Sequence, residues 1–190
     1  MARGTSFLKD SLGKPIFADG VFVIDDPLRE RGLRSHAFDG EGLATARRTI
    51  IDDGLLTTWL LDLRSARQLG LASTGHASRG TSGPPSPSPS NLYLEAGEKT
   101  PQEMIAETKY GLYATSLMGQ GVNMVTGDYS RGATGHLIEN GALTKPVTEV
   151  TIAGNLKDML RRLEPADDLT FRYGVDSPTV RIDAISLAGS

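Results

Sequence analysis

The residues of this chain that could do chemistry gather between Leu117 and Gly154. Residues 128–131, Asp-Tyr-Ser-Arg, form a polar cluster that could hold a substrate. The plainer interpretation is a loop in which Asp128 and Arg131 satisfy the backbone and each other. Residues 119–121, Gly-Gln-Gly, could present N–H groups to an anion, but the Walker pattern and a helix-opening GxGxxG are missing. No nucleophile is paired with a base, so we predict no catalytic residue here.

The three histidines, at positions 36, 76 and 136, are the next candidates, as metal ligands. A hydrolytic zinc site needs three protein ligands and a water. No two of these histidines form an i, i+4 helical pair, and the chain has no cysteine. We therefore predict no metal site in this chain. His76 lies in a Gly/Ser/Pro-rich stretch, where we expect it to be solvated. His136 and Glu139 fall on opposite faces of a predicted strand, so the strand does not bring them together as a catalytic or metal-binding pair.

The composition and charge of the chain argue against several classes of function. The chain has 190 residues, of which 38% are hydrophobic and 23% charged, as in an ordinary globular domain. Its 20 basic and 23 acidic residues give a net charge of -3, so we predict no direct binding of nucleic acid. No apolar run approaches the ~18 to 20 residues that span a membrane, and no secretory signal is apparent. Together with the missing cysteines, this favours a cytoplasmic protein.

The elements that must position these residues are short strands, hairpins and helices. A strand is predicted at residues 21–24, and a hairpin at residues 47–62 turns at Asp53-Gly54 and carries Trp59 in its second strand. Residues 65–70 predict a helix of one or two turns. A long Pro/Ser-rich loop is predicted at about 77–91, followed by strands at 92–97 and 111–118. A helix at 101–109 begins with a capping box at Thr100, and a helix at 155–164 is capped by Asn155. A hairpin at 136–147 turns at Asn140-Gly141, and two strands close the chain. The fold class is therefore α+β, mostly antiparallel β-sheet with hairpins and two or three short helices.

A set of motifs, each weak alone, occurs in one order along the chain. The motifs are Phe38-Asp39-Gly40-Glu41-Gly42, Trp59-Leu60-Leu61, Ser73-Thr74-Gly75-His76, Asn91-Leu92-Tyr93, Leu117-Met118-Gly119-Gln120-Gly121, Thr126-Gly127-Asp128-Tyr129-Ser130-Arg131, Ile138-Glu139-Asn140-Gly141 and Thr151-Ile152-Ala153-Gly154-Asn155. Together they resemble the C-terminal region of the TldD/PmbA family, on its PmbA/TldE-like branch. The resemblance covers nearly all of the chain from about residue 5.

The resemblance implies a cytoplasmic proteolytic system in which a TldD-like zinc metallopeptidase subunit pairs with a PmbA-like subunit. It implies roles in maturing a microcin precursor and degrading an antitoxin, and the label "modulator of DNA gyrase". TldD-like members hold the metal with an HExxxH helix and a cysteine near the C-terminus. This chain has residues 171–176, Phe-Arg-Tyr-Gly-Val-Asp, where that cysteine would lie. We therefore expect a non-catalytic partner subunit without a cofactor of its own, with zinc on the TldD-like partner.

Residues 1–190 are then expected to form a single C-terminal domain, with the N-terminal domain of the family absent. Extended peptides are expected to bind by strand addition around residues 119–125, where glycines permit close backbone approach. The substrate-cleft candidates are Asn91, Tyr93, Gly119, Gln120, Gly121, Asp128 and Arg131. The alternative is a non-enzymatic scaffold module that binds peptides or proteins. The sequence leaves a homo-oligomer open.

Overall fold

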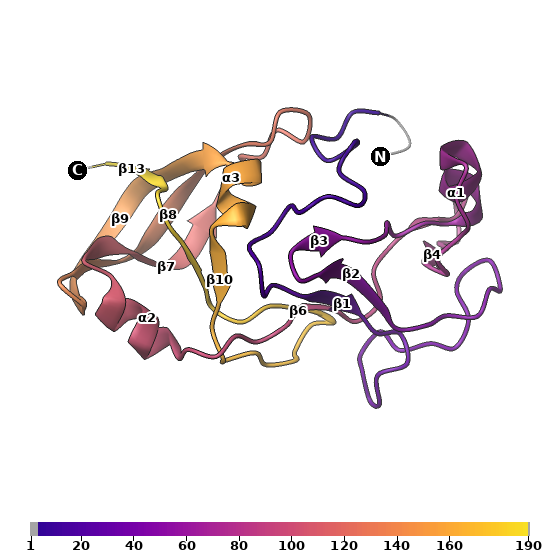
Figure 1. The fold of residues 1–190 in the computed structure, drawn as a ribbon, viewed down its shortest axis with the longest axis horizontal. Helices are drawn as coiled ribbons and strands as arrows, with labels where there is room; N and C mark the ends of the chain where they lie inside the picture. Colours follow the sequence, from indigo (N-terminus) through magenta and orange to yellow (C-terminus); the bar gives the residue numbers. More distant parts are fainter. Residues whose placement is uncertain (1–3, 190) are drawn as a thin grey trace.

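The computed structural model describes residues 4–189, which form two main sheets and three short helices (Figure 1). The helices are α1 (Leu63–Leu69), α2 (Pro101–Glu107) and α3 (Leu156–Arg161). The five-stranded sheet has, in spatial order, β11 (Val175–Asp176), β6 (Leu92–Leu94), β1 (Val23–Asp25), β2 (Arg48–Asp52) and β3 (Leu55–Leu56). The four-stranded sheet has β13 (Ser186–Ala188), β9 (Ala142–Asn155), β8 (Asp128–Glu139) and β7 (Tyr110–Met118). Two further pairs join β4 (Ala77–Ser78) to β5 (Ser86–Pro87) and β10 (Leu163–Pro165) to β12 (Val180–Ile182).

The strand pairs are antiparallel except for β6 with β11. The predicted α+β class, mostly antiparallel sheet with short helices, is therefore confirmed. In Figure 1 the long strands β7, β8 and β9 lie at one end of the molecule, and α1 lies at the other. The five-stranded sheet runs between them and carries a small core of Ile16, Ile51 and Leu56.

The two predicted hairpin turns are confirmed. Asp53 and Gly54 have φ of 49° and 78°, and Asn140 and Gly141 have φ of 52° and 81°. Positive φ at both central residues is what a type I′ turn requires. Trp59 was predicted within the second strand of the first hairpin, and this is wrong because β3 ends at Leu56. Trp59 instead lies beyond the strand and packs against the Ile51 cluster.

Local capping signals locate the helices. Thr100 caps α2, accepting from the N–H of Glu103 while the Glu103 side chain accepts from the N–H of Thr100. Asn155 caps α3 as predicted, but the predicted helix to residue 164 is wrong because α3 ends at Arg161. Residues 163–165 form β10 instead and pair with β12. Pairing with a distant strand has overridden the helical pattern there.

The helices of residues 4–189 span six or seven residues each. Within that described part of the chain, no helix has the length and apolar character needed to cross a membrane.

Candidate functional site

A buried polar network joins β1 to the two ends of the Pro/Ser-rich loop. Asp25 is fully buried and receives the N–H of Ser90 at 2.8 Å and the Ser90 hydroxyl at 2.5 Å. Nε2 of His76 lies 3.0 Å from the same carboxylate and is the donor, because an ionised carboxylate only accepts. Nδ1 of His76 lies 2.8 Å from the hydroxyl of Thr74. The prediction of a solvated His76 is therefore wrong, since this residue is only 4% exposed.

Asp25, His76 and Ser90 are the residue types of a catalytic triad, but their order differs. In a triad the histidine lies between serine and aspartate, so that it can take the hydroxyl proton. Here the carboxylate lies between, and the Ser90 hydroxyl donates to Asp25. The three residues hold the two ends of the Pro/Ser-rich loop, at residues 76 and 90, against β1. We call them the Asp25 clasp. This arrangement activates no nucleophile.

The clasp sets the ionisation of Asp25. Burial by itself raises the pKa of this carboxyl, but the hydrogen bonds from His76 and Ser90 outweigh it, and the pKa lies below its ordinary value of 3.8. A carboxyl whose pKa is lowered by folding stabilises the native state wherever it is ionised. That contribution is complete above the ordinary pKa and is lost as the pH falls toward the lower, folded value.

We therefore expect the free energy of unfolding to fall as the pH is lowered below about 4. Replacing Ser90 with alanine removes one of the donors that lower the pKa of Asp25, so the decrease in the free energy of unfolding at low pH should become smaller. Urea unfolding of both proteins between about pH 2 and pH 6 measures this difference. Identical pH profiles for the two proteins would show that the clasp does not shift the pKa.

Of the predicted cleft residues, Tyr93 lies on β6 and Asn91 directly precedes that strand. The Asn91 side chain is buried, donating to the Asp26 carbonyl and the Ser35 hydroxyl and accepting from the N–H of Arg34. The ring of Tyr93 meets Phe171 edge to face at 5.1 Å. Both side chains therefore join β6 to neighbouring segments of the chain. Their role as substrate-cleft residues stays a prediction.

The other five predicted residues lie where β7 ends and β8 begins. Asp128 accepts from the Thr126 hydroxyl at 2.6 Å and from Asn155 Nδ2 at 3.1 Å. Arg131 donates from Nη2 to the Leu117 carbonyl at 3.3 Å, and its Nε is buried without a hydrogen-bond partner. The two residues therefore contact other groups rather than each other. Gly121 comes close to Arg131, whereas Tyr93 belongs to the five-stranded sheet and Asn91 directly precedes its strand β6.

The strand predicted at residues 119–125 is not formed, whereas a role of these residues in peptide binding stays a prediction. The chain turns back after β7, and the N–H of Ser130 donates to the Gly121 carbonyl at 2.8 Å. A Cβ added to Gly121 would lie 1.4 Å from the carbonyl oxygen of Ser130. The glycine therefore permits close approach of the chain to itself.

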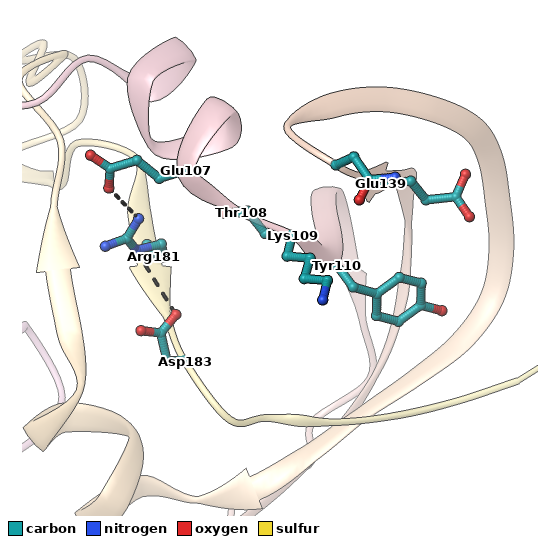
Figure 2. Close-up of a pocket in the computed structure, with 8 residues that line it drawn as sticks. Glu107, Thr108, Lys109, Tyr110, Glu139, Arg181 and Asp183 are labelled. Carbon is teal, nitrogen blue, oxygen red and sulfur yellow. Dashed lines mark hydrogen bonds and ion pairs between the residues drawn. The ribbon is translucent and has the colours of Figure 1, made fainter.

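A hollow that the sequence did not indicate opens at the other end of β7 (Figure 2). This cavity has a volume of about 820 Å³ and is lined by Glu107, Thr108, Lys109, Tyr110, Glu139, Asn140, Arg181 and Asp183. Arg181 bridges to Glu107 at 2.9 Å, and Lys99 reaches the same carboxylate at 2.7 Å. Hydrogen bonds from these two cations lower the pKa of Glu107. No local motif could have found this site, because it is assembled from α2, the β8–β9 turn and β12.

The three histidines were the metal-ligand candidates of the sequence. His76 is committed to the Asp25 clasp, His36 contacts the Arg34 carbonyl, and His136 lies on β8. Within residues 4–189 no three His, Cys, Asp or Glu side chains are grouped so that they could hold a metal ion.

The fold and these residues place the chain in a known class. A profile of the PmbA/TldA metallopeptidase C-terminal domain matches residues 1–189. The chain therefore belongs to the PmbA/TldD family and corresponds to its C-terminal domain. It is 44% identical over 188 residues to the metalloprotease PmbA of Escherichia coli O157:H7, a match covering 98% of this chain and 40% of that protein. A TldD homologue from Haemophilus influenzae is 26% identical, over 99% of this chain and 42% of that protein.

Solved structures agree with this assignment. The crystal structure of TldE from Thermococcus kodakarensis superposes with a TM-score of 0.87 at 25% identity, covering 98% of this chain and 44% of that one. A protein from Thermotoga maritima, named as a candidate modulator of DNA gyrase, gives a TM-score of 0.84 at 32% identity, covering 98% of this chain and 43% of that one. The chain thus spans about 40% of the length of the PmbA protein that it matches.

Proposed function

We propose that this chain is the C-terminal domain of a PmbA/TldE-like subunit that works with a TldD-like metallopeptidase on peptide substrates. The observation that carries the proposal is the 44% identity to PmbA across 98% of the chain, against 26% to a TldD homologue. The subunit acts in the cytoplasm. Its substrates are unfolded peptides of the kinds that the family resemblance implies, a microcin precursor and an antitoxin.

The chemistry of the side chains supports a non-catalytic role. A zinc peptidase must hold its metal with three protein ligands and leave one position for water. The chain has no cysteine, and its buried histidine, His76, is occupied by Asp25 and Thr74. In this proposal the catalytic zinc therefore belongs to the TldD-like partner, and this chain helps to enclose the peptide.

A stand-alone scaffold module would share the fold but would need no peptidase partner. Sedimentation of the full chain mixed with a TldD-like metallopeptidase subunit separates the two functions. We expect a stable complex of the two proteins, and we expect the complex to hydrolyse an unfolded casein substrate faster than the TldD-like subunit alone. Two proteins that sediment independently at micromolar concentration would contradict the proposal and favour the scaffold.

A further inference from the structure

Two segments of the chain carry basic residues and no acidic ones. Residues 63–94 contain three arginines without any aspartate or glutamate. Residues 31–38, Arg-Gly-Leu-Arg-Ser-His-Ala-Phe, contain two more arginines and likewise no acid. The whole chain has a net charge of -3, so these segments reverse the sign of the chain around them. A local concentration of positive charge attracts anionic ligands to its part of the surface.

The fold brings these two segments to one cavity. The cavity has a volume of about 600 Å³ and lies between residues 34–40 and the two ends of the Pro/Ser-rich loop. Arg34 and His36 line it from the first segment, and Arg79 lines it from the second. Among the residues that the structure describes, those lining this cavity include no aspartate or glutamate. Its volume is in the range of small-molecule sites.

The two arginines of this cavity are available to a ligand. Within residues 4–189 neither the Arg34 guanidinium nor the Arg79 guanidinium has a hydrogen-bond or ion-pair partner. The acidic residue next to the cavity, Asp39, is buried and accepts from the N–H groups of Leu43 and Ala77. Its oxygens are therefore committed to the backbone, and they leave both guanidinium groups unneutralised.

Hydrogen bonds hold the main chain of both segments in place. The N–H of Gly40 donates to the Ala77 carbonyl at 2.7 Å, and the N–H of Arg34 donates to the Asn91 side chain at 3.0 Å. A Cβ at Gly40 would lie 2.9 Å from the Ala77 carbonyl oxygen and 3.0 Å from the backbone nitrogen of Arg79, so a glycine is needed for this close approach. The arginines therefore extend from ordered backbone, which lowers the entropic cost of binding.

We propose that this cavity binds the phosphate group of a small ligand, with Arg34 and Arg79 as its cationic contacts. A phosphate monoester carries nearly two negative charges at neutral pH and three strong acceptor oxygens. One arginine can already hold a carboxylate by two hydrogen bonds, so a second, unpaired arginine from a separate segment favours the doubly charged group. The hydroxyls of Ser78 and Ser88 also line the cavity and can donate to such a ligand. The inference goes beyond the proposed peptide function and does not depend on it.

Isothermal titration calorimetry of the full chain with phenyl phosphate, at about pH 8 and constant ionic strength, tests this proposal. We expect binding at one site, about tenfold or more tighter than the binding of benzoate, which carries a single charge on the same ring. Arg79→Gln should weaken the binding of phenyl phosphate about tenfold or more. Arg64→Gln is the matched control, because it removes the same charge from an exposed position on α1 outside the cavity. It should leave the affinity unchanged.

Amide chemical shifts of the unaltered chain keep the test decisive if Arg79→Gln unfolds. Phenyl phosphate should shift the amide signals of residues 34–36 and 76–79 and leave those around the cavity at Lys109 unmoved. The absence of saturable binding would overturn the inference. Equal affinity for benzoate, equal weakening by Arg64→Gln, or shifts confined to other residues would overturn it as well.

Discussion

Replacing Asp25 with alanine should destabilise the domain by about 3–5 kcal/mol, among the largest effects of any single substitution in this chain. The carboxylate is fully buried and is the common acceptor for His76 and for both the N–H and the hydroxyl of Ser90. Without it, three buried donors lose their partner, and each unsatisfied donor costs about 1–3 kcal/mol. Urea unfolding followed by circular dichroism measures the loss.

The same substitution should also release the Pro/Ser-rich loop. His76 and Ser90 hold the two ends of this loop on β1 through Asp25, so limited proteolysis within residues 79–89 should become faster in Asp25→Ala. Asp52→Ala is the control, because Asp52 is an exposed aspartate at the end of β2 and should change stability by less than about 0.5 kcal/mol. Equal stability of the two variants would refute the assignment of Asp25 as the clasp.

Gly135→Ala should cost about 3 kcal/mol, for a steric reason. A Cβ at Gly135 would lie 1.9 Å from the carbonyl oxygen of Tyr113 and 3.0 Å from the Cα of Ala114. These are backbone atoms of β7, and they cannot rotate away as a side chain could. The strands β7 and β8 would have to separate at this point. Thermal unfolding, with a midpoint well below that of the unaltered chain, measures the effect.

Gly132 provides the matched control for this prediction. It lies on the same strand, and a Cβ there would meet only Met118, with its nearest atoms at 3.6 Å, an ordinary contact. Gly132→Ala should therefore stay within about 0.5 kcal/mol of the unaltered chain. A loss at Gly132 equal to that at Gly135 would mean that any side chain on β8 is unfavourable, and the close approach of Tyr113 would not be the cause.

The parts of the fold that could be predicted from the sequence are those set by near neighbours. Asn140-Gly141 predicts its turn because few other residues accept positive φ, and Thr100 predicts the start of α2 because its partner Glu103 is three residues away. The α+β class follows from such local signals added together. The family resemblance also depends only on residue order and spacing, and the profile match across residues 1–189 confirms it.

The candidate site was harder to predict because its contacts are distant in sequence. His76 is surrounded by glycine, serine and proline, and nothing nearby indicates that Asp25, 51 residues earlier, would bury it. The glycines at 119 and 121 predicted an open strand, yet Gly121 is needed because Ser130 returns against it. The cavity around Lys109 and Arg181 likewise joins residues that only the tertiary fold brings together.

In the proposed function, the peptide chemistry of this PmbA/TldE-like domain depends on a partner's metal. Elemental analysis of the purified full chain, prepared without chelators beside a TldD-like subunit, tests it most directly. We expect stoichiometric zinc on the TldD-like subunit and only trace zinc on this chain. Stoichiometric zinc on this chain, retained through gel filtration, would contradict it.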